Sequence, residues 1–391
     1  MDVGKGVHHA IGLHAGGRRL YDAPLPNSEP QLRAVFDRLA VHGPLLVVVD
    51  QPATIGALPV AVARAAGHEV AYLPGLAMRR IAQLYPGQAK TDARDAFVIA
   101  DAARTLPHTL RRLDAGDDAL AELGVLVGFD DDLAGEATRM SNRIRGLLTG
   151  LHPALERVLG PRVGHPAVLE ILSRCGGPAG ITKAGRRQVA AIAAAHAPRI
   201  GARLVEDVWA ALAEQTVTVA GTAAADIVLP RLADSLKTVL LQRKRVAAEV
   251  EGIVDAHPLA PVLISMPGVG VRTAARILVE IGDGSRFASA AHLAAYAGIA
   301  PVTRRSGSSI RGERPSHSGN RRLKRALFLA AFAALRDPTS RAYYQRKRDE
   351  GKPHNAALIC LARRRCDVLF AMLRDRRHYW PPQAAPMPAA A

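Results

Sequence analysis

The run PLLVVVD at residues 44–50 restricts the fold of this chain more than any other segment. It is rich in β-branched residues and has no polar alternation, which is typical of a strand buried on both faces of a sheet. The segments that follow it fit such a sheet, because residues 55–67 predict a helix closed by a glycine and residues 68–75 predict another strand. The pattern predicts an α/β domain.

The segments around this run complete the same domain. Residues 7–24 contain short apolar runs on either side of Gly16 and Gly17, which predicts a β-hairpin. Residues 28–43 begin with a serine suited to a helix cap and end at a glycine, and residues 91–104 carry a further helical pattern. We therefore expect residues 1–110 to form an α/β domain around a mixed sheet.

Helical patterns replace the strand signals beyond this domain. Long helices are predicted over residues 117–151 and 226–254, so we expect residues 111–257 to form an antiparallel helical or coiled-coil arm, with turns near 152–166 and 175–185. Residues 258–380 are expected to form a mainly helical C-terminal domain. The Pro/Ala-rich residues 381–391 predict a disordered tail.

The charge of the chain is concentrated near one end. The chain has 52 Lys/Arg against 35 Asp/Glu, and residues 302–378 hold 20 Lys/Arg against 6 Asp/Glu, which is +14 of the total +17. Such a segment favours nucleic acid as a partner. No run of about 18 apolar residues and no signal pattern is present, so we expect a cytoplasmic protein without a membrane partner. The Ala/Arg-rich composition indicates a bacterial protein. The three cysteines lack the spacing of a disulfide framework or a zinc site.

Four aspartates are candidates for a metal site. Asp50 ends the buried strand, and Asp92 and Asp95 are spaced i, i+3 on one face of a predicted helix. Each has a simpler explanation, since Asp50 could cap a strand end and the pair could lie on a solvated helix. With Asp2 before the hairpin, however, they have the layout of an RNase H-like fold, in which carboxylates converge on Mg²⁺ or Mn²⁺.

A second candidate site is the Ser/Gly-rich basic segment at residues 304–328. It could be a flexible loop that grips phosphates, or it could carry a serine nucleophile for phosphoryl transfer. Clamping arginines would be Arg304, Arg305 and Arg311. The residues alone do not choose among the three serines near the start of the segment, which are Ser306, Ser308 and Ser309.

The turn ProGlyValGly at 267–270, between an apolar segment and a long helix, predicts a helix-hairpin-helix motif. Its glycines would let helix N-terminal N–H groups face a phosphate. The same four residues could also form an ordinary turn without a nucleic-acid contact. We expect nucleic acid to contact Gly268 and Gly270 and also the basic residues that follow the serines, namely Arg314, Arg321, Arg322, Lys324 and Arg325.

Taken in order, these segments resemble the insertion-sequence one-ten family of transposases, the bridge-RNA-guided recombinases of bacterial insertion sequences. The resemblance covers most of the chain and rests on MDVGK, VVVDQPATIG, AKTDARDAFVIADAAR, SMPGVGVRTAARILVEIGD and RRSGSSIRGERPSHSGNRRLKRALF. It implies an N-terminal RuvC-like domain, a coiled-coil arm and a C-terminal transposase domain.

The resemblance also implies a site and partners. Asp2, Asp50, Asp92 and Asp95 would match the family's Asp-Glu-Asp-Asp set that binds Mg²⁺, and Ser306 would match its nucleophilic serine. The family forms a transient serine–DNA phosphodiester at a site shared between protomers, as dimers that pair into a tetramer. A structured guide RNA made by the element pairs with target and donor DNA.

The chain departs from the family pattern at two of these positions. Asp50 stands where the family commonly has glutamate, which shortens the reach of the carboxylate by one methylene. Asp2 directly follows Met1, so we expect a truncated first strand, with either an upstream start or a weakly anchored Asp2. Two other functions fit the same residues: a RuvC-like junction nuclease in which water attacks, and a non-catalytic nucleic-acid-binding protein.

Overall fold

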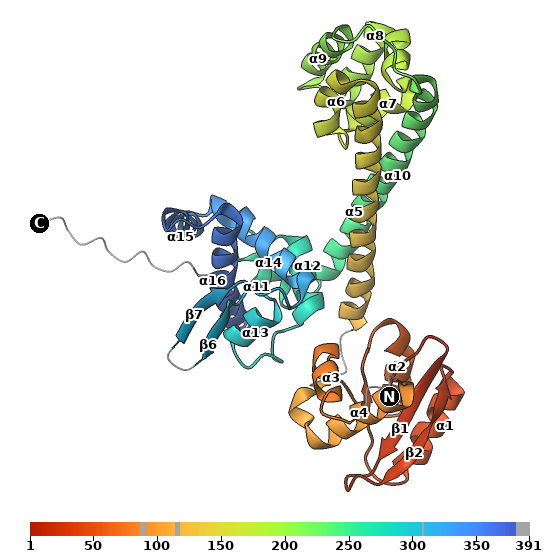
Figure 1. The fold of residues 1–391 in the computed structure, drawn as a ribbon, viewed down its shortest axis with the longest axis vertical. Helices are drawn as coiled ribbons and strands as arrows, with labels where there is room; N and C mark the ends of the chain where they lie inside the picture. Colours follow the sequence, from red (N-terminus) through yellow and green to blue (C-terminus); the bar gives the residue numbers. More distant parts are fainter. Residues whose placement is uncertain (87–90, 114–117, 307–308, 381–391) are drawn as a thin grey trace, which may run out of the picture. The chain divides into compact units, whose positions relative to one another are not determined.

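The computed structural model describes residues 1–86, 91–113, 118–306 and 309–380 (Figure 1). The chain divides into two compact units, Met1–Asp117 and Asp118–Ala391. Both are mixed α/β, but strands are concentrated in the first and helices in the second. Within the described ranges, no helix combines the length and apolar character needed to cross a bilayer. The predicted tail, 381–391, lies outside the described residues.

The described part of the first unit contains two small sheets and four α-helices. An antiparallel hairpin pairs β1 with β2, and a second sheet has the order β3-β4-β5, parallel between β3 and β4 and antiparallel between β4 and β5. The elements are β1 (Val7–Leu13), β2 (Arg19–Pro26), α1 (Glu29–Ala40), β3 (Leu46–Val49), η1 (Thr54–Gly56), α2 (Ala57–Ala65), β4 (Glu69–Tyr72), α3 (Gly75–Ala82), α4 (Asp92–Thr105), η2 (Pro107–Thr109) and β5 (Arg111–Arg112).

Strand β3 is covered on both faces, as its sequence predicts. Val47 and Val49 belong to the core that includes residues of α1 and α2, whereas Val48 belongs to the core that includes residues of α3 and α4. Successive side chains of a strand point to opposite faces, so a run of valines joins two cores. This burial fixes the carboxyl end of β3, where Asp50 follows.

Residues 1–3 lie between the two sheets. Asp2 and His9 exchange two backbone hydrogen bonds of 3.0 Å each, and the Met1 amino group donates to the Val48 carbonyl across 2.8 Å. The segment therefore joins the edge of β1 to the edge of β3. The weak anchoring considered for Asp2 is not found, because its backbone pairs on the β1 side and its neighbours pair on the β3 side.

The sequence prediction omitted three elements of this unit, α3, η2 and β5. Helix α3 has only eight residues and no side-chain cap at its start, so its pattern is too short to stand out. Strand β5 has two residues. The predicted hairpin, the strands near 44–50 and 68–75, and the helices near 28–43, 55–67 and 91–104 are confirmed.

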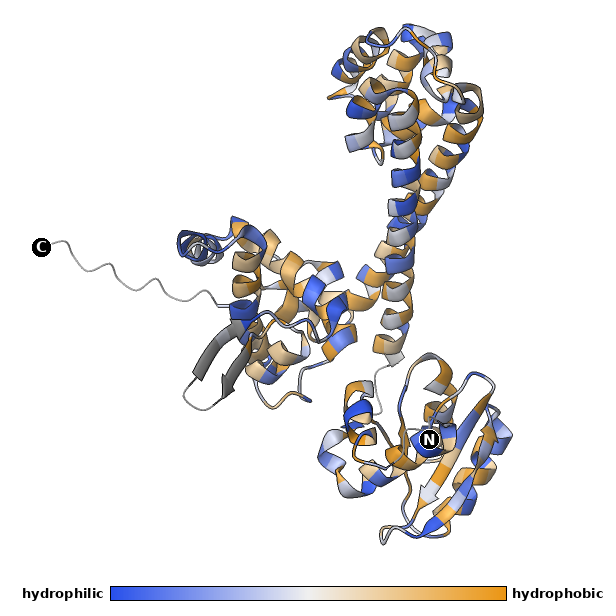
Figure 2. Ribbon diagram, viewed as in Figure 1, coloured by the Kyte–Doolittle hydropathy of each residue, from blue (hydrophilic) through white to orange (hydrophobic). Residues whose placement is uncertain are grey.

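The second unit begins with a long pair of helices. The α5 and α10 helices pack side by side and run in opposite directions, with α6 to α9 between them in the chain (Figure 1). Figure 2 shows that both alternate between hydrophobic and hydrophilic residues along their lengths. The elements are α5 (Asp118–Leu151), α6 (Pro153–Leu159), η3 (Gly160–Arg162), α7 (Pro166–Cys175), α8 (Pro178–His196), α9 (Gly201–Ala213) and α10 (Thr222–Asp255).

The two turns predicted within the arm are partly wrong. Residues 153–159 form α6, where a proline in the first turn and a buried face of Ala154, Leu155 and Leu159 outweigh the turn-like Gly and Pro content. A turn does occur at Gly176 and Gly177, but α8 begins directly after it. Gly185 then has non-helical angles and kinks α8.

The rest of the second unit, where the structure describes it, is helical except for one hairpin. Strands β6 and β7 pair antiparallel, with Ser306 opposite Ser309. The helix α15 is coloured largely hydrophilic in Figure 2. The elements are α11 (Ala260–Ile264), α12 (Val271–Ile281), α13 (Ala290–Tyr296), β6 (Val302–Ser306), β7 (Ser309–Arg314), α14 (Arg321–Ala333), η4 (Ala334–Arg336), α15 (Pro338–Asp349) and α16 (His354–Asp375).

Candidate active site

The four predicted acids come from three segments of the first unit. Asp2 sits in the bridging segment, Asp50 follows β3, and Asp92 and Asp95 lie in the first turn of α4. Thr91 caps that helix, its side chain accepting from the Arg94 N–H across 3.3 Å. Carboxylates are stabilised near a helix N-terminus by its unpaired N–H groups. Asp92 is exposed, whereas the other three acids are partly buried.

The negative charges of the other three acids affect the pKa of Asp2. Burial and the negative charges of Asp50, Asp95 and Asp92, in that order, raise the pKa of Asp2 to about 6. Like charges raise a carboxyl pKa only when they are close, so the fold gathers carboxylates that are far apart in the sequence. In the described ranges, however, no three acidic, His or Cys side chains are close enough together to hold a metal ion.

Asp50 is fixed by a backbone contact. The Val3 N–H donates to Asp50 Oδ1 across 3.1 Å, and the turn after Asp50 is closed by a 2.8 Å bond from the Gln51 amide to the Thr54 hydroxyl. Gly56 is required in this turn, since a Cβ there would stand 1.8 Å from the Gln51 carbonyl oxygen. One carboxylate oxygen of Asp50 therefore orients the segment that carries Asp2.

Sequence reasoning missed His8, which supports the same segment. His8 is buried, and its Nδ1 accepts from the Gly4 N–H across 3.1 Å. Burial lowers the pKa of His8, so the ring is neutral and can accept there. A Cβ on Gly4 would stand 2.1 Å from the Val7 carbonyl oxygen, which explains the glycine of MDVGK. The only sequence signal is a glycine four residues before a histidine.

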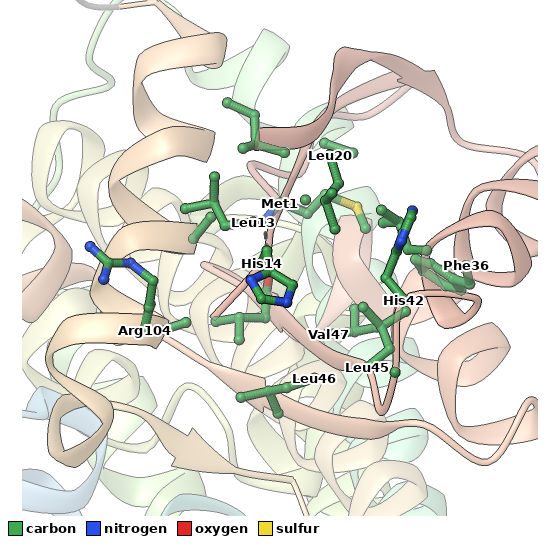
Figure 3. Close-up of a pocket in the computed structure, with 18 of the residues that line it drawn as sticks. Met1, Leu13, His14, Leu20, Phe36, His42, Leu45, Leu46, Val47 and Arg104 are labelled. Atoms are coloured by element: carbon green, nitrogen blue, oxygen red, sulfur yellow. Dashed lines mark hydrogen bonds between the residues drawn. The ribbon is translucent and has the colours of Figure 1, made fainter. Parts of the chain in front are cut away.

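A cavity of about 510 Å³ also lies in the first unit, and none of the four acids lines it. Leu13, Leu45 and Val47 are among the apolar side chains around it, and His14 and His42 also line it (Figure 3). Arg104 lies at its edge but is already paired with Asp101 at 2.8 Å. The cavity and the four acids therefore share no residues.

The predicted serine lies in the second unit. Ser306 is the last residue of β6 and pairs with Ser309, the first residue of β7, while Ser308 lies outside the described residues. Arg304, Arg305 and Arg311 belong to the same two strands. The first part of the segment thus lies in a β-hairpin and its last residues begin α14, whereas one interpretation of its composition was a flexible loop, because Ser, Gly and Arg carry little strand signal.

Two glycines brace the base of this hairpin. Gly298 and Gly319 both have positive φ, and a Cβ on Gly319 would stand 2.6 Å from the Gly298 nitrogen. The Asn320 N–H next to them donates to the Tyr296 carbonyl across 2.7 Å, and the Asn320 carboxamide oxygen caps α14. Both ends of the hairpin are therefore tied to α13 and α14.

The ProGlyValGly turn connects α11 to α12. Gly268 has a φ of +80°, and a Cβ there would stand 2.4 Å from the Ala330 carbonyl oxygen of α14. The buried Arg365 guanidinium donates to the Pro267 carbonyl. Gly268 thus faces α14, whereas Gly270 is exposed and precedes the first turn of α12.

The other predicted contact residues lie at or near the start of α14. Arg314 ends β7, and Lys324 donates to the Ser316 carbonyl across 3.2 Å. Arg321, Arg322 and Arg325 project from the first turns of α14 and are exposed. A carboxamide cap followed by arginines gives this helix start a strong positive charge.

Comparison with known proteins identifies the family. Residues 1–153 match the DEDD transposase model of IS110, described as "Transposase", and residues 260–345 match the model described as "Transposase IS116/IS110/IS902 family". These two matches cover the acid-bearing and the serine-bearing parts of the chain.

Whole-length relatives agree with these models. The IS110 uncharacterized 43.6 kDa protein of Streptomyces coelicolor is 61% identical over 97% of this chain and 94% of its own. The IS900 uncharacterized 42 kDa protein of Mycobacterium paratuberculosis is 36% identical over 97% and 96%, and the mini-circle putative transposase for IS117 of S. coelicolor is 31% identical over 95% and 92%. The chain therefore belongs to the IS110 family of insertion-sequence transposases, enzymes that cleave and join DNA.

Proposed function

We propose that this transposase exchanges DNA strands through a serine–DNA phosphodiester formed by Ser306, with the four aspartates binding a divalent cation. The metal binding is supported by the fold, which brings the segment that carries Asp2 to Asp50 through the 3.1 Å bond from the Val3 N–H, and by the pKa of Asp2, which three other carboxylates help to raise. The serine half is supported by the β6–β7 hairpin, which places Ser306 at a strand end beside arginine-bearing positions. We further propose that it acts in the bacterial cytoplasm.

The four carboxylates suit Mg²⁺ or Mn²⁺ by their chemistry, although in the described residues they would have to move closer together to share one ion. Both are hard cations that prefer carboxylate oxygens, and crowded carboxylates that repel one another are stabilised by a divalent charge. Asp2, Asp50, Asp92 and Asp95 would hold it, with Asp50 keeping one oxygen on the Val3 N–H. When bound, the cation would stabilise negative charge on a reacting phosphate.

The chemistry needs no nucleotide hydrolysis. The Ser306 hydroxyl would lose its proton and bond to the phosphorus as the bond from phosphorus to a deoxyribose oxygen breaks, and that oxygen would take up a proton and leave as a free hydroxyl. The hydroxyl of a second strand would later attack the phosphorus, and serine would leave and regain its proton. Each step exchanges one phosphodiester for another, so the free-energy change is small. Arg304, Arg305 and Arg311 would stabilise the charge on the non-bridging oxygens.

We infer the remaining features from the family. The first unit would be an RNase H-like, RuvC-like domain, which the placement of residues 1–3 between β1 and β3 supports. A guide RNA would pair with target and donor DNA, so that the protein reads mainly backbone and shape. The ProGlyValGly turn would act as a helix-hairpin-helix, and dimers would pair into a tetramer that shares the active site between protomers.

A denaturing gel tests the serine. With end-labelled DNA, Mg²⁺ and the guide RNA of the element, the unchanged protein is expected to leave a slowly migrating protein–DNA adduct. Ser306→Ala should abolish the adduct. Ser309→Ala, which changes the paired residue of strand β7, should retain it. Cleavage by Ser306→Ala without any adduct would instead identify a nuclease in which water attacks.

A further inference from the structure

A second cavity, of about 420 Å³, lies within the second unit where α5, α10, α12 and α14 meet. Its charged lining is strongly basic, with six arginines and two aspartates, a net charge of six minus two, or +4. The arginines come from three helices that are far apart in the sequence. They are Arg243, Arg272, Arg276, Arg321, Arg322 and Arg325.

Both aspartates are already neutralised. Asp130 takes two hydrogen bonds from Arg243, at 2.9 and 3.2 Å. Asp131 is 2.6 Å from the buried Arg276. These pairs leave four arginine side chains at the cavity for which the described part of the chain provides no ion pair: Arg272, Arg321, Arg322 and Arg325.

The buried apolar residues that line the cavity strengthen the electric field of the four arginines. Val127, Val250 and Ala275 line the cavity and are buried, so part of its wall has a low dielectric constant and screens the arginine charges less than water does. Arg272 also stands in the first turn of α12, whose cap residue, Gly270, offers no side-chain acceptor. The N–H groups of that turn add partial positive charge on the same side.

We propose that this cavity binds the phosphodiester backbone of duplex DNA and forms a second backbone contact, distinct from the serine hairpin. Arginine forks match phosphate oxygens in charge and geometry, and four such forks around one concavity suit one or two adjacent phosphates. DNA is the occupant because a transposase acts on DNA. The inference rests on the DNA-binding half of the proposed function and needs neither Ser306 nor a metal.

The test is non-covalent binding of the full-length protein to a linear DNA duplex of random sequence, with EDTA present so that no strand is cut. The triple variant Arg272→Gln/Arg322→Gln/Arg325→Gln is compared with Arg187→Gln/Arg199→Gln/Arg203→Gln, which removes the same charge from exposed positions on or near α8 and α9. Equal thermal unfolding midpoints for both variants establish that each is folded.

The cavity variant is expected to bind at least about tenfold more weakly. The slope of log K against log salt should become shallower by about 0.9 for each phosphate that the variant no longer neutralises. The control variant should change neither quantity by as much. The corresponding triple lysine variant should recover part of the affinity, because the charge is kept but the fork is removed.

Three results would overturn the proposal: equal weakening by the control variant, an unchanged salt slope in the cavity variant, or weakening confined to an RNA duplex of the same sequence. None of them bears on whether Ser306 forms an adduct with DNA. An adduct that persists in Ser306→Ala would overturn the serine proposal but, with DNA binding unchanged, would leave the cavity proposal standing, so the two proposals fail separately.

Discussion

The backbone N–H of Val3 donates a hydrogen bond to the carboxylate of Asp50 across 3.1 Å, although 47 residues separate them. The bond ties the segment that carries the first predicted metal ligand to the residue that is the second. It engages Oδ1 of Asp50, so Oδ2 is not needed to hold this segment. The side chain thus has a positioning role that does not depend on its charge.

Two substitutions separate these roles. Asp50→Asn keeps an oxygen that can accept from Val3 but removes the charge, so we expect little change in the free energy of unfolding and a lower pKa for Asp2, since Asp50 is the largest charge acting on it. Asp50→Ala leaves the Val3 N–H without its acceptor and should cost about 1–3 kcal/mol. Chemical denaturation measures the first quantity, and NMR titration of the Asp2 carboxyl the second. Equal destabilisation by the two substitutions would contradict the positioning role.

The stability of the metal-free protein should depend on pH through Asp2. The unfolded carboxyl titrates near 3.8 and the folded one near 6, so the folded state binds more protons between these values. The free energy of unfolding contributed by Asp2 is therefore full below pH 3.8 and falls as the pH rises through about 6. Thermal unfolding of the unchanged protein minus that of Asp2→Asn isolates this contribution.

Saturating Mg²⁺ should reverse the pH dependence of this difference in stability between the unchanged protein and Asp2→Asn. A bound cation requires the Asp2 carboxylate, so its affinity should fall about tenfold for each pH unit below the Asp2 pKa. Calorimetric titration with Mn²⁺ at several pH values measures that slope. An affinity that stays constant from about pH 7 down to about pH 5 would remove Asp2 from the ligand set.

The sequence predicts the elements of the first unit better than the contacts that organise its site. The valine run identifies β3 because burial on both faces leaves a compositional mark, and Asp50 follows from its end. The Val3 bond leaves no such mark, because it is made by a backbone N–H that almost any residue could supply. The role of His8 is equally hidden, since it depends on a ring nitrogen facing Gly4 in the folded chain.

The second unit shows the same limit at the serine hairpin. Ser, Gly and Arg favour turns and solvent, so the segment predicts a loop, but the closely packed backbone of Gly298 and Gly319 holds its ends together. The arginine cavity could not be predicted either, because Arg272 and Arg243 reach it from helices outside the basic segment. Such sites depend on tertiary packing, which periodicity does not reveal.

The close contact of Gly298 with Gly319 predicts a selective loss of stability. Gly319→Ala places a methyl group 2.6 Å from the backbone of Gly298 and also strains a residue with φ of +109°. Gly351→Ala is the matched control, since its φ is +83° but no atom lies within 4 Å of the added Cβ. We expect the control to cost about 1 kcal/mol and Gly319→Ala at least about 3 kcal/mol, because backbone cannot move aside as a side chain can. Urea denaturation measures both, and equal costs would mean that the contact is not tight.

Arg276 should be among the most sensitive charged residues of the second unit. Its buried guanidinium lies 2.6 Å from Asp131 on α5 and 3.3 Å from Glu280, and Glu280 in turn accepts from the Asn320 amide across 2.6 Å. The Glu280 side chain is only 12% exposed. Arg276→Met would leave this largely buried carboxylate without its cation, at a cost of about 3–5 kcal/mol.

An exposed ion pair provides the control for this change. Arg157 pairs with Glu214, but the side chains are 60% and 57% exposed, so Arg157→Met should cost less than about 1 kcal/mol. Adding Glu280→Gln to Arg276→Met should restore part of the lost stability, because the amide can still accept from Asn320 without a buried charge. Thermal and urea unfolding of the three variants measure these differences. Arg276→Met and Arg157→Met could instead lower the free energy of unfolding equally. Burial of the Arg276–Glu280 pair would then contribute nothing to stability, and neither would the link from α5 through α12 to the start of α14.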